Sequence, residues 1–224
     1  MKIYRRSDLE SYEPHDWLLE RLTVEARGND ADYTTHKWLL DSLPKRMIFA
    51  DLYGDLLDCR GLRVLDIGGG YSSLGRALAE RHDYTLVEIM AHDEHEEFAR
   101  LATSSGVFWQ ASDWLGFAAD GHYDVIIAND LFPNVDQRLD QFILRYKDLT
   151  DELRISLTFY NEPRWYTVRR VDADEVFAMM AWDGAQVERC LSNHLPADAI
   201  ADLASESESL FPNGRHIARV TFER

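Results

Sequence analysis

One stretch decides the fold of this chain: Val64-Leu65-Asp66-Ile67-Gly68-Gly69-Gly70-Tyr71-Ser72-Ser73. Its apolar start predicts a buried strand over 62–67, and a helix is expected to begin near Ser73. The glycines between them permit positive φ angles and let a ligand approach the main chain closely. The first N–H groups of the helix lack partners within it, so they can donate to a ligand over the turn. The stretch therefore predicts a small-molecule site at the end of the first strand.

The residues of this turn separate two classes of ligand. A dinucleotide-binding loop follows G-x-G-x-x-G, and here Gly68 and Gly70 fit while Ser73 occupies the third glycine position. Asp66 also places a carboxylate at the strand end, where it would repel a pyrophosphate. S-adenosylmethionine (SAM) carries an ammonium and a sulfonium but no phosphate, so it suits this turn better. An NAD(P)-dependent oxidoreductase and a plain turn capped by Asp66 are the alternatives.

The composition limits the classes of partner that this chain is expected to bind. The chain has 224 residues, 46% of them hydrophobic, which is enough for one domain with a sizeable core. The formal net charge of −16 disfavours binding to nucleic acid and to anionic membranes. Cys59 and Cys190 show no metal-ligand spacing and indicate free thiols in a reducing compartment. No signal peptide or membrane span is recognisable, so we expect a cytoplasmic protein, with a homodimer as one option for its assembly.

The periodicity of apolar residues changes near residue 60. Helical spacing predicts helices at 15–27 and 33–57, after an extended lead-in over 1–14. Strands then alternate with helices, which predicts a mostly parallel sheet with helices on both faces. We therefore expect an N-terminal helical lid or extension over 1–59 and a ligand-binding domain over 60–224. The expected strands are 62–67, 84–87, 107–110, 123–128, 153–160, 187–191 and 217–222, and the expected helices are 73–81, 93–104, 135–147, 173–182 and 196–205.

The carboxyl ends of these strands carry polar residues, and ligands of parallel sheets bind at such ends. Glu88 closes the second strand, where an acid can accept both hydroxyls of a ribose, although it could instead cap the next helix. After the third strand, a side-chain oxygen of Ser112 or Asp113 can accept from an adenine amino group, and Trp114 can cover the ring. Asp113 as a helix N-cap is the alternative.

Residues 60–147 resemble the core of the class I SAM-dependent methyltransferases. The resemblance rests on Val64–Gly70, on Glu88, on Ser112–Trp114 and on Tyr123–Asp130. It implies a Rossmann-like, doubly wound, seven-stranded sheet whose last hairpin is antiparallel, formed here by 187–191 and 217–222. It also implies SAM as cofactor and N- or O-methylation of a small molecule such as an amino acid, amine or secondary metabolite. The same fold can cleave other carbon–sulfur bonds of SAM, so aminocarboxypropyl transfer or cyclisation is the alternative, and a non-catalytic partner subunit is a third.

The resemblance also assigns roles to individual residues. The glycines would lie under the methionine part of SAM, and Asp66 would interact with its amino group. Glu88 would hold the ribose, and the residues after the third strand would hold the adenine. The expected cofactor-binding residues are Asp66, Gly68, Gly69, Gly70, Glu88, Ser112, Asp113, Trp114 and Asn129.

The segment Asn129–Phe132 would face the methyl group. It is similar to the Asn/Asp-Pro-Pro-Tyr motif of amine and amide N-methyltransferases, but Asp-Leu replaces Pro-Pro and Phe132 replaces the tyrosine. This departure disfavours methylation of nucleic-acid bases. Asp130 could orient an amine or act as a base, or it could be a turn residue.

Tyr33 and His36 lie at the start of a predicted lid helix and are two further catalytic candidates. A histidine in a lid can act as a base, although a surface or capping role is the alternative. Trp38 is expected to pack in the core. His92 and His95 could share a helix face, but the acidic residues around them indicate a solvated helix start, so we expect no metal site.

Overall fold

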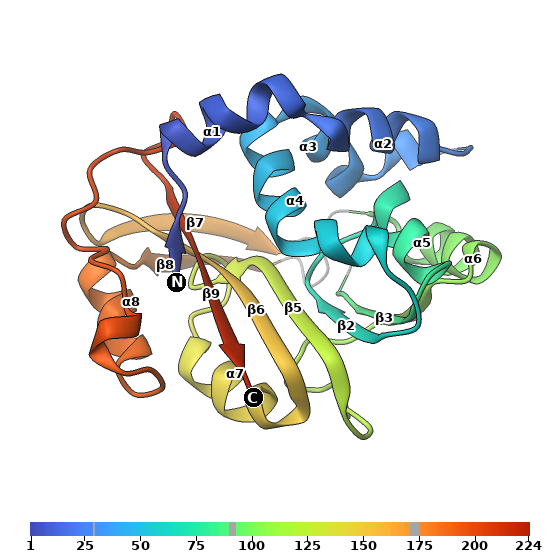
Figure 1. Cartoon of the computed structure of the whole chain (residues 1–224). Coiled ribbons are helices and arrows are strands. Elements are labelled where there is room, and N and C mark those ends of the chain that lie inside the picture. The colour runs from blue at the N-terminus through green and yellow to red at the C-terminus, as the bar shows by residue number, and fades with distance from the viewer. Residues whose placement is uncertain (29, 90–92, 171–174) are drawn as a thin grey trace.

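A seven-stranded sheet forms the centre of the computed structural model, which describes residues 1–28, 30–89, 93–170 and 175–224 (Figure 1). The strand order is β1-β9-β6-β5-β2-β3-β4. Neighbouring strands from β4 to β6 pair in parallel, and β9 is antiparallel to both β6 and β1. The mostly parallel sheet is confirmed. The bounds are β1 Lys2–Ile3, β2 Arg63–Ile67, β3 Asp83–Val87, β4 Phe108–Gln110, β5 Tyr123–Phe132, β6 Thr150–Phe159 and β9 His216–Glu223.

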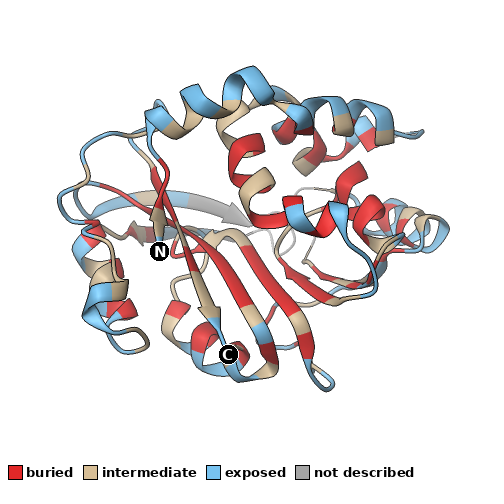
Figure 2. Cartoon of the chain, viewed as in Figure 1, coloured by how far each residue is buried: buried red, intermediate tan, exposed pale blue. Residues whose placement is uncertain are grey.

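Helices cover both faces of this sheet, because successive side chains of a strand point to opposite faces. Val64 and Val125 pack with the first set of helices, α2 to α6, whereas their neighbours Leu65 and Ile126 pack with α7 and α8. Figure 2 shows that most residues of the central strands are buried as a result. The helices are α1 Arg6–Tyr12, α2 Trp17–Glu25, α3 Thr34–Asp41, α4 Leu43–Asp58, α5 Ser73–Ala79, α6 His95–Ser105, α7 Leu139–Tyr146 and α8 Gly184–Leu191.

The N-terminus belongs to the sheet. Ile3 pairs with Ala218 of β9, and the Tyr4 hydroxyl donates a 2.6 Å hydrogen bond to Asp51 of α4. The expected extended lead-in over 1–14 is therefore wrong beyond its first residues, because α1 follows at once. This helix buries none of its residues, so it has no apolar periodicity to reveal it.

The C-terminal third differs most from the expected order. The predicted helix over 173–182 is strand β8 (Glu175–Ala181), paired antiparallel with β7 (Arg164–Arg170), and residues 173 and 174 lie outside the described ranges. The predicted strand over 187–191 is helix α8, and Asp183 caps this helix by accepting from the Gln186 backbone N–H at 2.8 Å. The predicted helix over 196–205 is only a short turn, Ala197–Ala199.

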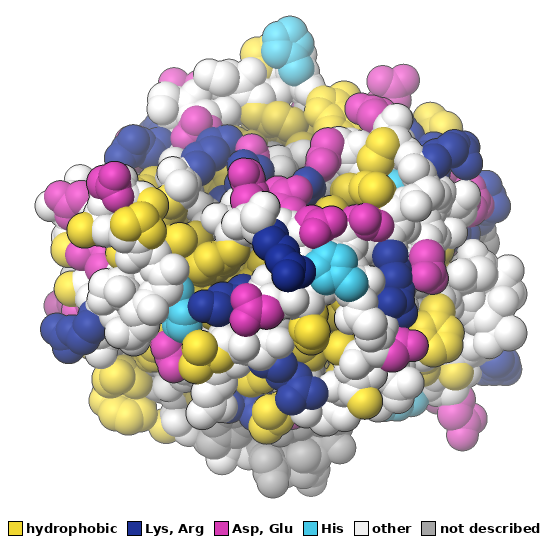
Figure 3. Space-filling view, turned by 60° about the horizontal axis from the view of Figure 1, so that its bottom comes forward, with side chains coloured by type: hydrophobic (Ala, Val, Ile, Leu, Met, Phe, Trp, Pro, Cys, Tyr) yellow, Lys and Arg dark blue, Asp and Glu magenta, His cyan; other side chains and the backbone are white. Residues whose placement is uncertain are grey.

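The antiparallel end of the sheet is consequently built from different segments than expected. Strand β9 is antiparallel, as predicted, but its edge partner is the N-terminal β1 rather than 187–191. Acidic and basic side chains are interspersed on the face drawn in Figure 3. Within the described ranges, every helix is too short or too polar to cross a membrane.

Candidate active site

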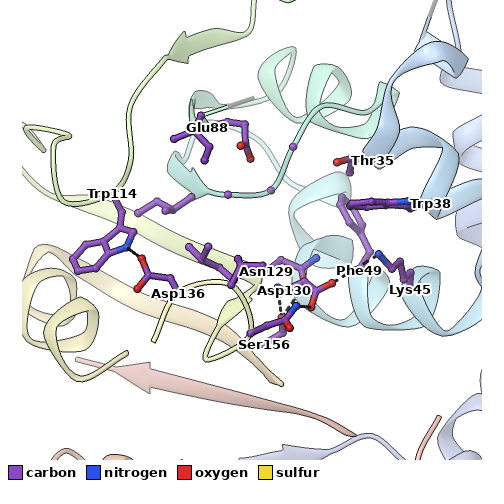
Figure 4. Close-up of a pocket in the computed structure, with 18 of the residues that line it drawn as sticks. Thr35, Trp38, Lys45, Phe49, Glu88, Trp114, Asn129, Asp130, Asp136 and Ser156 are labelled. Carbon is purple, nitrogen blue, oxygen red and sulfur yellow. Dashed lines mark hydrogen bonds and ion pairs between the residues drawn. The ribbon is translucent and has the colours of Figure 1, made fainter. Parts of the chain in front are cut away.

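A cavity of about 400 Å³ lies at the carboxyl ends of β2, β3 and β5, with α3 and α4 on its other side (Figure 4). Its size falls in the range of small-molecule sites. Figure 4 shows Glu88, Trp114 and Asp136 at one end, Trp38, Phe49 and Lys45 at the other, and Asn129, Asp130 and Ser156 between them. The predicted site residues that line the cavity are Gly68, Gly69, Gly70, Glu88, Ser112, Asp113, Trp114, Asn129 and Asp130.

The glycine turn after β2 is enclosed by the protein's own side chains. Gly68 and Gly70 adopt φ angles of +71° and +65°, which favour glycine. A Cβ on Gly70 would lie 2.0 Å from the Thr35 hydroxyl oxygen, and a Cβ on Gly69 would lie 2.4 Å from the Asp66 carboxylate oxygens. Glycine is therefore required both for the backbone conformation and for the contact with Thr35 of α3.

Asp66 packs against Gly69 of this turn and does not line the cavity. Its carboxylate is buried and accepts hydrogen bonds from the hydroxyls of Tyr53 (3.0 Å) and Tyr84 (2.7 Å). Burial raises the pKa of Asp66 to about 7, against the opposing effect of the two tyrosine hydrogen bonds. Asp66 therefore lies beneath Gly69, with both carboxylate oxygens hydrogen-bonded to tyrosine hydroxyls, and its interaction with a cofactor amino group stays a prediction.

Backbone hydrogen bonds fix the end of the cavity near Glu88. The Glu88 N–H donates to Gln110 (3.2 Å), and the indole of Trp109 donates to the Glu88 carbonyl (3.0 Å). Asp113 accepts from the Gly116 N–H at 2.7 Å, which closes a turn, because no helix begins at this position.

Trp114 is almost fully buried at this end. Its indole N–H donates to Asp136 at 2.6 Å, and the Arg138 guanidinium lies 4.7 Å from the ring centroid. Asp136 also accepts from Arg138, so three side chains hold one another in place. Neither Asp136 nor Arg138 was predicted, because they follow β5 in a segment without a recognisable motif.

Asp130 lies at the middle of the cavity in a conformation that is rare for a non-glycine residue. Its φ is +57°, at the register shift between β5 and β6. Its backbone N–H donates to the hydroxyl of Ser156 at 2.7 Å, and that hydroxyl donates to Asn129 at 2.8 Å. Ser156 of β6 therefore fixes both residues. Asp130 stays a candidate to orient an amine or to act as a base.

Two cations that the sequence did not reveal approach the Asp130 carboxylate. A terminal nitrogen of Arg215 donates to its two oxygens at 3.1 and 3.2 Å, and Lys45 Nζ lies 3.8 Å from Oδ2. Lys45 lies 4.0 Å from the ring centroid of Trp38, which is 42% exposed and lines the cavity, so the expectation of a core role for Trp38 is wrong.

The two catalytic candidates at the start of α3, Tyr33 and His36, lie outside the cavity lining. His36 is buried, and its Nδ1 accepts from the Ser73 N–H at 3.3 Å; burial lowers its pKa. Tyr33 packs edge-on against Tyr71 with ring centroids 5.0 Å apart. Neither residue is among those that line the cavity, and their catalytic roles stay predictions. Because His36 and the Ser72 hydroxyl accept from the first turn of α5, those N–H groups are directed to the protein itself rather than to a ligand.

Hydrogen bonds between Thr34 and Asp93 connect α3 to the segment before α6. The Asp93 carboxylate accepts from both the N–H and the hydroxyl of Thr34 at 3.0 Å. Asp93 also lines the cavity, so this pair links α3 to the cavity wall. His92, one of the two histidines weighed as metal ligands, lies outside the described residues, and no group of three potential ligands occurs within them.

No protein-family model and no curated protein sequence matches the chain. The structure of Burkholderia thailandensis 1,6-didemethyltoxoflavin-N1-methyltransferase, with 1,6-didemethyltoxoflavin and S-adenosylhomocysteine (SAH) bound, is 19% identical, with a TM-score of 0.50 over 78% of this chain and 75% of that one. The DhpI–SAH complex is 17% identical, with a TM-score of 0.50 over 90% and 93%. This chain has the Rossmann-like fold of the class I SAM-dependent methyltransferases that its motifs resemble.

Proposed function

We propose that the chain is a SAM-dependent methyltransferase that acts on nitrogen or oxygen of a small-molecule acceptor. The observation that carries the proposal is the convergence of the glycine turn, Glu88 and Trp114 on one cavity at the carboxyl ends of parallel strands. Two proteins of the same fold, 1,6-didemethyltoxoflavin-N1-methyltransferase and DhpI, have SAH bound in their structures.

The residues of the cavity fit SAM in size and in charge. The volume of about 400 Å³ is that of a site for a cofactor-sized ligand. The main chain of Gly68–Gly70 would contact the methionine part, Glu88 would accept from the ribose hydroxyls, and Asp113 and Trp114 would flank the adenine. Acids at this end also suit a ligand that carries a sulfonium cation.

Methyl transfer needs positioning more than acid–base chemistry. When bound, SAM would supply a methyl group on a sulfonium: the lone pair of the acceptor bonds to the methyl carbon as the carbon–sulfur bond breaks, and the electrons of that bond stay on sulfur, which gives SAH. The chain must hold the acceptor atom in line with that group and keep water out. Asp130 and Ser156 border the middle of the cavity, where an acceptor N–H or O–H could donate to the carboxylate before its proton is lost.

Calorimetric titration of SAH tests the cofactor site directly. We expect the wild type to bind SAH, and Glu88→Ala to bind it about 100-fold more weakly, because two hydrogen bonds to a charged group are lost. Glu96→Ala is the matched control, since Glu96 is an exposed acid of α6 outside the cavity. If folded wild-type protein binds neither SAM nor SAH, the proposal is wrong.

The products of SAM turnover separate methyl transfer from its alternative. Mass spectrometry of SAM incubated with the protein and a metabolite extract should detect SAH together with an acceptor heavier by one methyl group. Methylthioadenosine in place of SAH would instead indicate aminocarboxypropyl transfer or cyclisation.

A further inference from the structure

The end of the cavity away from Glu88 carries an excess of positive charge. Lys45 and Arg215 both approach the single carboxylate of Asp130. Four other acids line the cavity. Asp93 accepts from Thr34, Asp136 accepts from Trp114 and Arg138, Asp113 lies 3.7 Å from Arg138, and Glu88 lies at the opposite end. Two cations against one acid leave one positive charge for a ligand to neutralise.

Both cations are held in partly desolvated, aromatic surroundings. The Arg215 side chain is 12% exposed and its guanidinium lies 4.3 Å from the ring centroid of Phe211, while the Lys45 side chain is 25% exposed and lies over Trp38. Charges in such surroundings interact more strongly with a ligand than charges in water do. The low exposure therefore favours a specific anionic ligand over bulk counter-ions.

Arg215 has unused hydrogen-bonding capacity. One terminal nitrogen donates to Asp130, but its buried Nε has no hydrogen-bond partner among the described residues. Buried donors without partners are rare in native structures, and a guanidinium matches a carboxylate through two parallel N–H donors. The backbone at Arg215 is fixed, because its N–H donates to Asn213 and its carbonyl accepts from Ser209.

Aromatic rings flank these charges. Phe49 lines the same end of the cavity and stacks on Tyr53 with ring centroids 4.0 Å apart, so its ring is held in place. Trp38 and Phe211 line it as well. Flat apolar surfaces beside a paired cation site suit an acceptor with an apolar or aromatic body and one anionic group.

We propose that the methyl acceptor is a small organic acid whose carboxylate binds between Arg215 and Lys45 while its apolar body packs against Trp38, Phe49 and Phe211. This inference rests on the proposed function, and it narrows the acceptor from any amine or metabolite to organic anions. Asp130 then acts as a positioning residue for the two cations as well as a neighbour of the reacting atom. A phosphonate or phosphate group would share the same chemistry, so the test includes it.

The test is binding of acid–amide pairs to the SAH-saturated protein. The probes are benzoate with benzamide and indole-3-acetate with indole-3-acetamide, measured by saturation-transfer NMR and by calorimetry, and phenylphosphonate forms a separate arm. We expect each acid to bind at least about tenfold more tightly than its amide, because an amide cannot neutralise a cation. Tighter binding of phenylphosphonate than of the carboxylates would assign the anionic group as a phosphonate or phosphate and overturn the carboxylate.

Variants connect this preference to the two cations. Arg215→Gln and, separately, Lys45→Gln should reduce the acid-over-amide preference about tenfold and change SAH affinity less than twofold. The matched control is Lys37→Gln, an exposed lysine of α3, which should change neither. If Arg215→Gln fails to fold, Lys45→Gln alone still tests the inference. Lys45 makes the longer contact to Asp130, so its replacement should disturb the fold less.

Besides the phosphonate result, three results would overturn the inference. Equal binding of acids and amides by the wild type would exclude an anion site. A parallel loss of SAH affinity in both variants would show that the cations bind the carboxylate of the cofactor instead. An unchanged preference in both variants would place the anion elsewhere. Failure of the wild type to bind SAH at all would count against the proposed function, and that result is separable from these three.

Discussion

Replacement of Asp66 by asparagine should remove a pH dependence of stability that burial of this carboxyl creates. The pKa of Asp66 is raised from 3.8 to about 7, chiefly by desolvation. The folded state therefore binds this proton more tightly than the unfolded state, so stability is fully present below the unfolded pKa and is lost as pH rises toward 7. Between pH 5 and pH 8 the loss amounts to about 3 kcal/mol at about 1.4 kcal/mol per pKa unit.

Urea unfolding at pH 5, 6, 7 and 8 measures this effect as a difference between wild type and Asp66→Asn. An asparagine can still accept from one of Tyr53 and Tyr84 and donate to the other, so the variant should fold. Burial lowers the pKa of His36, which works in the opposite direction and cancels in the difference. Asp41→Asn, at an exposed position on α3, should keep the wild-type slope. If Asp66→Asn also keeps that slope, the carboxyl does not titrate as the structure indicates.

Three further predictions concern the walls of the cavity. Gly70→Ala should weaken SAH binding by at least about tenfold in calorimetry, because its Cβ would clash with Thr35. The control is Gly106→Ala: Gly106 also has a positive φ angle, but no atom lies near its Cβ position, so this variant should bind SAH normally. Asp93→Ala should speed hydrogen exchange at the start of α3, because Thr34 loses its hydrogen bonds to the Asp93 carboxylate, whereas exchange in β5 should stay unchanged. An unaltered exchange rate in α3 would contradict a stabilising role of these two hydrogen bonds. Trp114→Phe should lower the free energy of unfolding by about 1.5–3 kcal/mol through loss of the Asp136 hydrogen bond, and the exposed Trp165→Phe should leave it unchanged; equal effects of the two would refute this role.

The parallel core could be predicted because its signals are local. Its strands carry apolar runs, such as Val125-Ile126-Ile127, and a polar residue follows each run at or near the strand end, although β5 continues past Asn129 to Phe132. Parallel pairing then brings those ends to one edge of the sheet. Glu88, Trp114 and Asn129 line one cavity for this reason, although they are far apart in sequence.

The C-terminal elements could not be predicted in the same way, because pairing overrides local preference there. The run Ala178-Met179-Met180-Ala181 consists of good helix formers, yet it pairs with β7 as a strand. For α8 a usable signal was present: Asp183 and Gln186 have the spacing of a capping box, and the structure forms both of its hydrogen bonds. A cap would have indicated the start of this helix where periodicity over eight residues did not.

The residues that the proposed function assigns to the cofactor could be named from sequence, whereas those that it assigns to the acceptor could not, and the reason is geometric. Lys45 lies in the first turn of α4, Asp130 lies near the end of β5, and Arg215 precedes β9, so no spacing rule joins them. They meet because β9 lies beside β6, which places the start of β9 next to the end of β5. A SAM site repeats from one protein of this fold to another because the ligand is constant, whereas an acceptor site is assembled from whatever segments border the remaining space. The charge on those segments therefore carries the information about the acceptor, and only the folded chain brings that charge together.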